Sequence, residues 1–306
     1  TGSKPYVIMS SSLQEERNNL YGRSKRDGRD QFNKWADRTG ADFTGLIIPN
    51  VFGPFGVPFY NSVISTFSHQ LMIGEEPRIE VDAELKLIYV GDLVRKVINL
   101  FPVDSTDSFT DHADKFNTDS TENTEIPERL IYVEHMDQYK VTELLEKLRG
   151  LYLTYVVGGV IPDITDYFDL CLFNTLRSYL SPEHFPVRYT RHTDPRGDYV
   201  EICRAMNAGQ SAYSTTVPGI TRGNHFHTRK VERFSVIKGK ASIKLRKLGR
   251  AEVKEYILDG SEPAYVDIPV WYTHNLTNIG DEELVTLFWI NEFYDPSDPD
   301  TFFEEV

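Results

Sequence analysis

Residues 219–239 read GITRGNHFHTRKVERFSVIKG and place two histidines and a glutamate between two glycines. Side chains alternate between the faces of a strand, so His225 and His227 are expected to point to the same side. The next residues suit a turn, after which Glu232 can return on the neighbouring strand toward the same point. His274, in the downstream segment PVWYTHN, offers a fourth donor. Imidazole and carboxylate donors that converge on one spot are what a divalent metal ion needs.

The spacing of these donors resembles the two metal-binding motifs of the cupin family. All five fixed positions of the first motif match, from Gly219 through the three donors to Gly239. In the second motif Trp271 stands where cupins usually have glycine, while the histidine keeps its place. Two histidines alone would be ordinary exposed strand residues, but the full set favours a metal site, with zinc as the expected ion.

The composition narrows the class of protein. A chain of 306 residues is long enough for about two domains, and its net charge of -13 argues against nucleic-acid binding and a basic membrane-binding surface. No signal peptide and no run of about 18 apolar residues is present, so a cytoplasmic protein without a membrane partner is expected. Cys171 and Cys203 fall in different predicted domains, and we expect both to be reduced thiols.

The amino-terminal segment contains a second group of candidate residues. The apolar run Tyr6–Met9 predicts a buried strand, and three serines follow it. Asn18 or Asn19 can cap the next helix, whose inward stripe contains Tyr21 and Lys25. An inward lysine one turn from a tyrosine is a candidate catalytic pair, because the positive charge favours loss of the phenol proton.

The segment YGRSK, with Ser12 nine residues before its tyrosine, resembles the catalytic pattern of the short-chain dehydrogenase/reductase family, particularly its extended nucleotide-sugar branch. In that family the tyrosine donates a proton to a carbonyl, the lysine tunes it and binds the nicotinamide ribose, and the serine positions the carbonyl oxygen. The resemblance implies these roles for Tyr21, Lys25 and Ser12, with Ser11 as the alternative serine.

Later segments fit the same family. The strand Phe43–Ile48 leads into PNVFGP, where the resemblance implies that Asn50 lies beside the nicotinamide and the sugar nucleotide; an ordinary turn is the alternative. The strand Leu85–Val90 is followed by Asp92, which we expect to cap a helix. Lys86 stands where related proteins often bind a pyrophosphate, although an exposed strand lysine explains it equally well.

The remainder of this half is expected to complete a substrate lobe. Residues 103–128 are acidic and polar, which predicts an exposed insertion. We expect a helix over Thr142–Arg149 that Gly150 closes, and an amphipathic helical stretch over Ile164–Leu180. No glycine-rich GxGxxG loop occurs, although a cofactor pyrophosphate needs one. Because the chain also opens directly on an apolar run, we expect the first part of the Rossmann fold, with its NADPH phosphate loop, to be missing from this sequence. The alternative is that this half cannot hold the cofactor as given.

From residue 181 onward, short strands alternate with turns, a pattern typical of a sandwich or closed jelly roll. The predicted fold is therefore a partial Rossmann-like α/β domain of the extended short-chain dehydrogenase/reductase type over residues 1–180, and an all-β cupin jelly roll over residues 181–306. The predicted strands are 188–191, 199–204, 210–216, 234–238, 241–248, 253–258, 264–268 and 283–291.

The pairing of the two domains resembles the bifunctional enzymes that make UDP-N-acetyl-L-fucosamine precursors for capsular polysaccharide and O-antigen. It implies C3 epimerisation of a UDP-4-keto-2-acetamido-2,6-dideoxy sugar in the cupin, followed by NADPH-dependent reduction at C4, in a homodimer. Lys230, Tyr272 and His192 are candidates for the base in the cupin. Two alternatives stay open: a metal-dependent dioxygenase or isomerase using iron, manganese or nickel, and a sugar-binding or assembly module with a structural metal.

Overall fold

The structure is a computed structural model that describes residues 5–101, 129–195, 197–206 and 209–306. The insertion expected at 103–128 lies outside the described residues. Among the helices that are described, none combines the length and the apolar character that a bilayer crossing requires.

Contacts divide the chain into two compact units. The first consists of Thr1–Gly53 and Ile79–Thr142, and the second of Pro54–Arg78 and Glu143–Val306. The chain therefore enters the second unit, returns to the first and enters the second again. This division follows contacts, whereas the boundary expected at residue 180 follows fold type and remains a proposal.

The first unit is built on parallel strands. One sheet pairs β2 (Asp42–Ile48) in parallel with both β1 (Tyr6–Ser12) and β5 (Leu130–Tyr132). All residues of β2 after the first are buried, as expected of a strand inside a parallel sheet. The strands predicted from the first two apolar runs are present, and the first of them extends through the serines. Tyr6–Met9 is only half-buried, because β1 is an edge strand of this sheet, so the prediction of a buried first strand is wrong.

A second small sheet follows in the same unit. Its central strand β4 (Glu84–Tyr89) pairs in parallel with β3 (Asn50–Phe52) and antiparallel with β6 (Asp137–Lys140). Leu46, Ile48 and Ile88 form the buried centre of the unit's apolar core. The Rossmann-like α/β prediction for this region is thereby confirmed.

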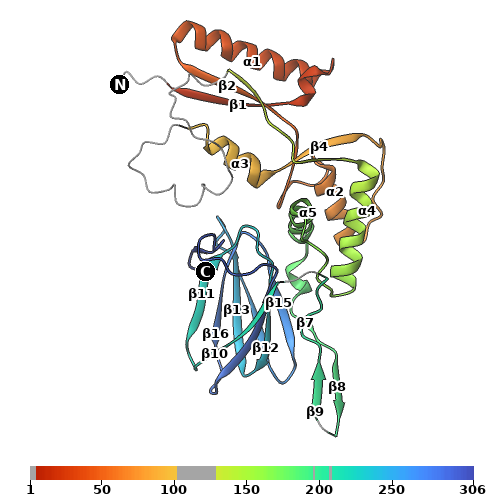
Figure 1. The fold of residues 1–306 in the computed structure, drawn as a ribbon, viewed down its shortest axis with the longest axis vertical. Helices are drawn as coiled ribbons and strands as arrows, with labels where there is room; N and C mark the ends of the chain where they lie inside the picture. Colours follow the sequence, from red (N-terminus) through yellow and green to blue (C-terminus); the bar gives the residue numbers. More distant parts are fainter. Residues whose placement is uncertain (1–4, 102–128, 196, 207–208) are drawn as a thin grey trace. The chain divides into compact units, whose positions relative to one another are not determined.

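Helix α1 (Leu20–Thr39) lies against β1 and β2 in Figure 1, after the short 3-10 turn η1 (Leu13–Glu16). The Asn19 side chain caps α1 by accepting a hydrogen bond from the Gly22 amide at 2.7 Å, as one of the two predicted caps would.

Helix α3 (Val90–Ile98) begins two residues before its expected cap. Its N-cap is Tyr89, which makes no side-chain capping bond, and Asp92 lies in the first turn, where it pairs with Arg95. The prediction that Asp92 caps this helix is wrong because β4 ends at Tyr89 and leads directly into the helix. An acidic residue in the first turn still stabilises a helix through the helix dipole.

The helical segments described in the second unit are α2 (Val63–Met72), α4 (Val141–Leu151, whose first two residues belong to the first unit), the π-helical η3 (Tyr152–Val157), α5 (Tyr167–Arg177) and the 3-10 helix η4 (Pro182–His184). The prediction that Gly150 closes this helix is wrong, because α4 runs on into η3 and the helical chain continues to Gly158. A glycine inside a helix costs only about 1 kcal/mol, and the burial of Leu148, Leu151 and Tyr155 offsets that cost.

The prediction that the stretch 164–180 is amphipathic is wrong, because nine of the eleven residues of α5 are buried. It is enclosed by other parts of the second unit. Ser178 follows directly after α5. Its hydroxyl donates to the Thr175 carbonyl at 2.7 Å and accepts from the Phe55 amide at 3.2 Å. The Tyr179 hydroxyl donates to the Gly56 carbonyl at 2.7 Å.

The carboxy-terminal part of the second unit is a sandwich of two five-stranded antiparallel sheets, shown in Figure 1. Apolar residues from both sheets, including Val236, Ile243 and Val266, fill the space between them. The predicted cupin jelly roll is confirmed. One sheet has the order β10 (Gln210–Thr216), β17 (Leu284–Ile290), β12 (Glu232–Lys238), β15 (Ala264–Ile268) and β7 (Val187–Arg188). The other has the order β14 (Val253–Asp259), β13 (Lys240–Lys247), β16 (Tyr272–Asn278), β11 (Thr221–Phe226) and β18 (Phe302–Phe303).

The strand predicted over 188–191 is two strands in the structure. The chain leaves β7 after Arg188 and starts β8 (Arg191–Asp194), which forms a separate hairpin with β9 (Gly197–Val200). The strand predicted over 199–204 therefore ends at Val200. The cause is a change of pairing partner, from β15 to β9, that apolar patterning does not reveal.

A buried polar network lies on the side of β12 and β15 that faces η3 and α5. Arg233 and Asp267 are in register and form two hydrogen bonds, at 2.7 and 2.9 Å. The Tyr155 hydroxyl donates to the same carboxylate at 2.7 Å, and Arg177 donates to the Ile268 carbonyl at 2.7 Å. Burial raises the pKa of Asp267, but the charge and hydrogen bonds of Arg233 outweigh it and hold this pKa below 3.8.

Candidate metal centre and reductase residues

Four predicted donors meet at one end of the sandwich. The ligand atoms of His225, His227, Glu232 and His274 all lie within 4.8 Å of one another. His225 on β11 stands directly opposite His274 on β16, and His227 follows immediately after β11. The histidines are thus brought together by one strand pair and its extension.

Glu232 reaches this group from the facing sheet. It is the first residue of β12, which belongs to the sheet opposite β11. The prediction that Glu232 returns on a neighbouring strand is therefore wrong, although its approach to the same point is confirmed. The turn after His227 carries the chain across the sandwich, so the donors come from both walls.

A bulge in β11 turns His225 toward the other donors. The register with β16 shifts between Gly223 and His225, and Asn224 has a φ of 64°. Gly223 has a φ of 102°, and a Cβ atom there would lie 2.8 Å from the His274 carbonyl oxygen. Glycine is needed at this position because the left-handed backbone lies so close to β16.

Each histidine has a backbone partner that orients its ring. His227 Nδ1 lies 2.5 Å from the Asp300 carbonyl oxygen, and His274 Nδ1 lies 3.4 Å from that of Tyr272. His225 makes a backbone hydrogen bond to Gly223. A carbonyl that accepts a proton from one ring nitrogen fixes the tautomer and leaves the other nitrogen for a metal.

The charges of the donors suit a cation. Burial and the neighbouring histidines His274 and His227 lower the pKa of His225 to about 4, so its imidazole is neutral at pH 7. Burial raises the pKa of Glu232, but its hydrogen bond with His227 and the nearby His274 ring outweigh this and lower the pKa overall. Burial lowers the pKa of His227, but its hydrogen bond to Glu232, at 2.8 Å, raises it overall.

One donor atom has no hydrogen-bonding partner. Nε2 of His274 is buried and makes no hydrogen bond, although the Glu232 carboxylate lies 3.5 Å away. Leaving a buried polar atom without a partner costs about 1–3 kcal/mol. Three imidazoles and one carboxylate at this spacing fit a zinc ion, which would supply the missing partner.

Trp271, which replaces the usual glycine of the second motif, has a φ of 64°. Glycine adopts this left-handed conformation without strain, which explains its usual place in the motif. Here the Trp271 ring stacks on Phe226, with centroids 6.1 Å apart, and its amide donates to the His227 carbonyl at 2.8 Å. These contacts hold the turn before His274 without a glycine.

Tyr21 and Lys25 are neighbours on α1 in the first unit. The Lys25 ammonium lies 5.7 Å from the Tyr21 ring centroid and donates to the Ser10 carbonyl at 3.3 Å. Tyr21 is 45% exposed, so the prediction that it lies on an inward stripe is wrong. The helix instead presents Gly22 to η1, where a Cβ atom would lie 2.3 Å from the Gln14 carbonyl oxygen.

The two candidate serines are not equivalent. Ser11 is buried, and its hydroxyl donates to Glu15, whose carboxylate accepts from Arg29 Nε at 3.1 Å. Ser12 accepts from the Gln14 amide at 3.2 Å and so keeps its hydroxyl proton for another acceptor. This difference favours Ser12 as the serine that donates to a substrate oxygen.

Asn50 and Lys86 lie on paired strands. The Asn50 side-chain amide donates to the Lys86 carbonyl at 3.1 Å, in the parallel pair of β3 and β4. The Lys86 side chain is exposed. The structure thus brings these two candidates of the reductase region together, and within the part of the chain that the structure describes neither contacts Tyr21.

The three candidate bases of the cupin differ in their surroundings. The buried Lys230 ammonium donates to the Pro299 carbonyl at 2.5 Å, and His192 lies exposed on the separate β8 hairpin. Tyr272 is half-buried, and burial raises the pKa of its phenol. These surroundings weaken all three as bases at the metal centre.

Sequence reasoning missed Asp300. Its carbonyl oxygen accepts from His227 across 73 residues of chain, and its carboxylate binds the turn that follows His227. No spacing pattern connects two positions so far apart, so only the fold reveals the contact. Cys171 and Cys203 are not joined by a disulfide in the structure.

Comparison with known proteins agrees with this architecture. Residues 3–106 match the NAD dependent epimerase/dehydratase family, and residues 192–302 match the polysaccharide biosynthesis C-terminal domain.

A UDP-2-acetamido-2,6-beta-L-arabino-hexul-4-ose reductase of Pseudomonas aeruginosa is 30% identical over 302 residues, which cover 97% of this chain and 74% of that protein. The spore coat polysaccharide biosynthesis protein SpsL of Bacillus subtilis is 24% identical over 120 residues, covering 36% of this chain and 80% of that protein.

Among solved structures, the capsular polysaccharide assembling protein CapF of Staphylococcus aureus is 32% identical. The similarity covers 99% of this chain and 77% of CapF, with a TM-score of 0.51.

The fold and the comparisons define an enzyme of nucleotide-sugar metabolism, with an epimerase/dehydratase-type α/β region and a carboxy-terminal cupin. The chain belongs to the family of the Pseudomonas aeruginosa reductase and Staphylococcus aureus CapF, the capsule-sugar enzymes that its two domains resemble.

Proposed function

We propose that the chain is a bifunctional enzyme of capsule or O-antigen synthesis. Its cupin inverts C3 of a UDP-4-keto-2-acetamido-2,6-dideoxy sugar, and its reductase domain then reduces the C4 ketone with NADPH. The observation that carries the proposal is the convergence of four donors, one of them a buried imidazole nitrogen without a partner. The name of the 30% identical relative, a UDP-sugar 4-ketone reductase, supports the substrate class.

His225, His227, Glu232 and His274 hold the metal in this proposal, and zinc fits their donor set. A bound zinc ion supplies Lewis-acid polarisation of a ketone oxygen. The protein's own contribution is a fixed donor set. Backbone contacts hold the three imidazole rings, and Glu232 provides the negative charge that partly balances a dication.

Epimerisation at C3 is chemically reasonable for a 4-keto sugar. The hydrogen on C3 lies next to the carbonyl, so a base can remove it and leave the charge as an enolate on the C4 oxygen. Return of a proton to the other face inverts C3. The reaction needs no net oxidation, so one cupin site can complete it.

Tyr21, Lys25, Ser12 and Asn50 carry the reduction in this proposal. Tyr21 gives its proton to the C4 oxygen, and the Lys25 ammonium, beside the tyrosine ring, stabilises the phenolate that remains. Ser12 donates a hydrogen bond to the same oxygen, and Asn50 borders the cofactor and sugar. Bound NADPH supplies the hydride. Reduction removes the acidity of the C3 hydrogen and so makes the new configuration permanent.

The proposed setting is the cytoplasm, where UDP-sugars are precursors and where two cysteines that form no disulfide stay reduced. A homodimer is the proposed assembly, since cupins commonly pair through their strands. Subcellular fractionation tests the location, and light scattering tests the homodimer.

Solvent exchange tests the epimerase directly. The zinc-loaded chain is incubated with the UDP-4-keto sugar in deuterium oxide without NADPH, and deuterium at C3 is measured by mass spectrometry and NMR. We expect incorporation that chelation or His274→Ala abolishes and that the control Tyr213→Phe, at an exposed tyrosine on β10, leaves intact. Zinc-loaded protein that incorporates no deuterium would contradict the proposed function and favour a structural metal.

A further inference from the structure

The carboxy-terminal segment from Asp300 to Glu304 contacts the backbone around the metal donors. Phe303 and Phe302 pair with His225 and Phe226, which makes β18 the edge strand beside β11. The Glu304 amide donates to the Asn224 carbonyl at 3.0 Å, and the Glu304 carbonyl accepts from the Thr273 hydroxyl. The segment thus borders three of the donors, directly or through a neighbouring residue.

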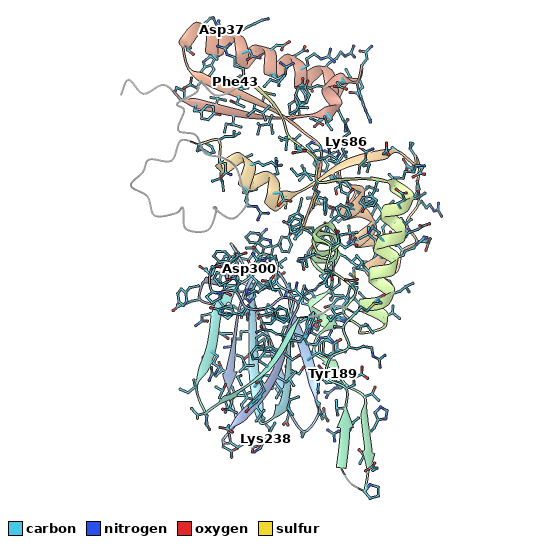
Figure 2. All side chains as sticks on the ribbon, viewed as in Figure 1. Asp37, Phe43, Lys86, Tyr189, Lys238 and Asp300 are labelled. Carbon is cyan, nitrogen blue, oxygen red and sulfur yellow. The ribbon has the colours of Figure 1, made fainter. Side chains whose placement is uncertain are left out.

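Asp300 makes the densest set of these contacts. It is 3% exposed, and Figure 2 labels it at the end of the sandwich opposite Lys238. Its carbonyl oxygen lies 2.5 Å from His227 Nδ1, on the side of the ring away from Glu232. This contact fixes the His227 tautomer that directs Nε2 toward the other donors.

The carboxylate of Asp300 binds the turn between His227 and Glu232. Oδ1 accepts from the Thr228 amide at 3.0 Å and from the Thr228 hydroxyl at 2.6 Å. Oδ2 accepts from the amides of Arg229 and Lys230, both at 3.0 Å. The buried carboxylate therefore satisfies three successive backbone donors of a turn that would otherwise leave them without partners.

We propose that Asp300 is a positioning residue of the metal centre, through which the last strand sets the separation of His227 and Glu232. The proposal rests on the proposed function, because it assumes that these residues bind zinc. Asp300 is not one of the four converging donors. The backbone carbonyl of Asp300 holds the His227 ring, and its side-chain carboxylate holds the turn that leads to Glu232.

Asp300→Asn is the sharpest variant for testing this role. Asp300 has a φ of 37°, and asparagine tolerates positive φ, so the change alters the turn contacts with little backbone strain. An amide keeps one acceptor oxygen but places an NH2 group against backbone donors, so part of the contact set is lost. Asp298→Asn is the matched control, since Asp298 pairs with the Arg229 side chain at 3.0 Å in the same segment.

The measurement is the zinc dissociation constant of the purified full chain, obtained by competition with a chromophoric chelator. We expect Asp300→Asn to raise this constant about 10–100-fold, as loss of a partner behind a metal ligand commonly does, and Asp298→Asn to change it less than about twofold. The visible spectrum of the cobalt-substituted protein is expected to shift in Asp300→Asn only, because a purely structural role would lower the melting temperature without changing the metal's coordination.

Wild-type zinc affinity and an unchanged cobalt spectrum in Asp300→Asn would overturn the positioning role while leaving the proposed function intact. A folded wild-type chain that binds no zinc would overturn both. If Asp300→Asn does not fold, Thr228→Val decides the question, because it removes only the 2.6 Å hydroxyl bond to Oδ1. A rise of about 2–10-fold in the zinc dissociation constant supports the role, and no rise contradicts it.

Discussion

The metal centre and the reductase residues are two candidate sites of different completeness. At the metal centre the donors touch one another, and backbone carbonyls hold all three imidazole rings. In the reductase region Tyr21 is 45% exposed, and its described partner is the Lys25 ammonium 5.7 Å from its ring. The candidate metal ligands are already positioned by contacts with one another and with the backbone. The Tyr21 hydroxyl, in contrast, acquires its catalytic hydrogen bond only when substrate and cofactor are bound.

This difference predicts that the two activities can be separated by mutation. Because the residues of each site lie in one compact unit, changes in one should leave the chemistry of the other measurable.

In protein that contains the NADPH phosphate loop, Tyr21→Phe is expected to lower the rate of NADPH oxidation by about 10²–10⁴-fold, because it removes the proposed proton donor to the C4 oxygen. Deuterium exchange at C3 should continue at the wild-type rate. Both rates are measured on the same preparation, with Tyr213→Phe as the control. NADPH oxidation that survives the change would show that another group donates the proton, and lost exchange would show that the two sites are not separable.

Asp267→Ala tests whether the cupin unit depends on its buried polar network. Removing the carboxylate leaves the Arg233 guanidinium buried without its partner, which is expected to cost about 3–5 kcal/mol in the free energy of unfolding. Urea denaturation followed by tryptophan fluorescence measures this loss. Asp259→Ala, which removes an exposed partner of Lys240, should shift the midpoint little. Equal effects of the two changes would contradict the stabilising role of the buried pair.

The contribution of the Asp267 carboxylate should depend on pH. Its pKa in the folded chain is below the ordinary value of 3.8, so folding favours the charged form. That stabilisation is fully present well above pH 3.8 and is lost as the pH falls through the lower, folded-state pKa. The difference in unfolding free energy between the wild type and Asp267→Asn should therefore be constant near pH 7 and shrink below about pH 4. A difference that grows on acidification would contradict this assignment.

Trp271 allows a smaller test at the metal centre. Trp271→Gly relieves the left-handed conformation but loses the stack on Phe226, whereas Trp271→Ala loses the stack and keeps the strain. The glycine variant is therefore expected to be more stable than the alanine variant by about 1 kcal/mol, the reverse of the usual order. Urea denaturation of the two variants measures the difference. If alanine were the more stable, the φ at Trp271 would not explain the motif glycine.

Sequence patterns predicted most of the strands and the convergence of the four residues at the candidate metal centre. The donors could be found because metal ligands are chemically few and their spacing follows the strand period. The paired domain types also follow from local motifs, since YGRSK and the two histidine motifs lie in short continuous segments.

The errors concern long-range contacts. Glu232 belongs to the facing sheet because the turn after His227 crosses the sandwich, and nothing in a short turn specifies which sheet receives it. Gly150 lies inside a helix because tertiary burial outweighs its low helix propensity. Asp300 was missed because its contact with His227 spans 73 residues. Local patterns describe a segment, but its partners depend on the complete fold.

The position of β18 also has a consequence for how the protein is made. A ribosome synthesises the chain from the amino end, so His225, His227, Glu232 and His274 all emerge before Asp300 and Phe303. Until Asp300 and β18 leave the exit tunnel, the His227 ring lacks its carbonyl partner and β11 has an open edge. In the proposed function, stable metal binding therefore follows the synthesis of β18, and a nascent chain that stalls before β18 exposes a sheet edge that chaperones can recognise.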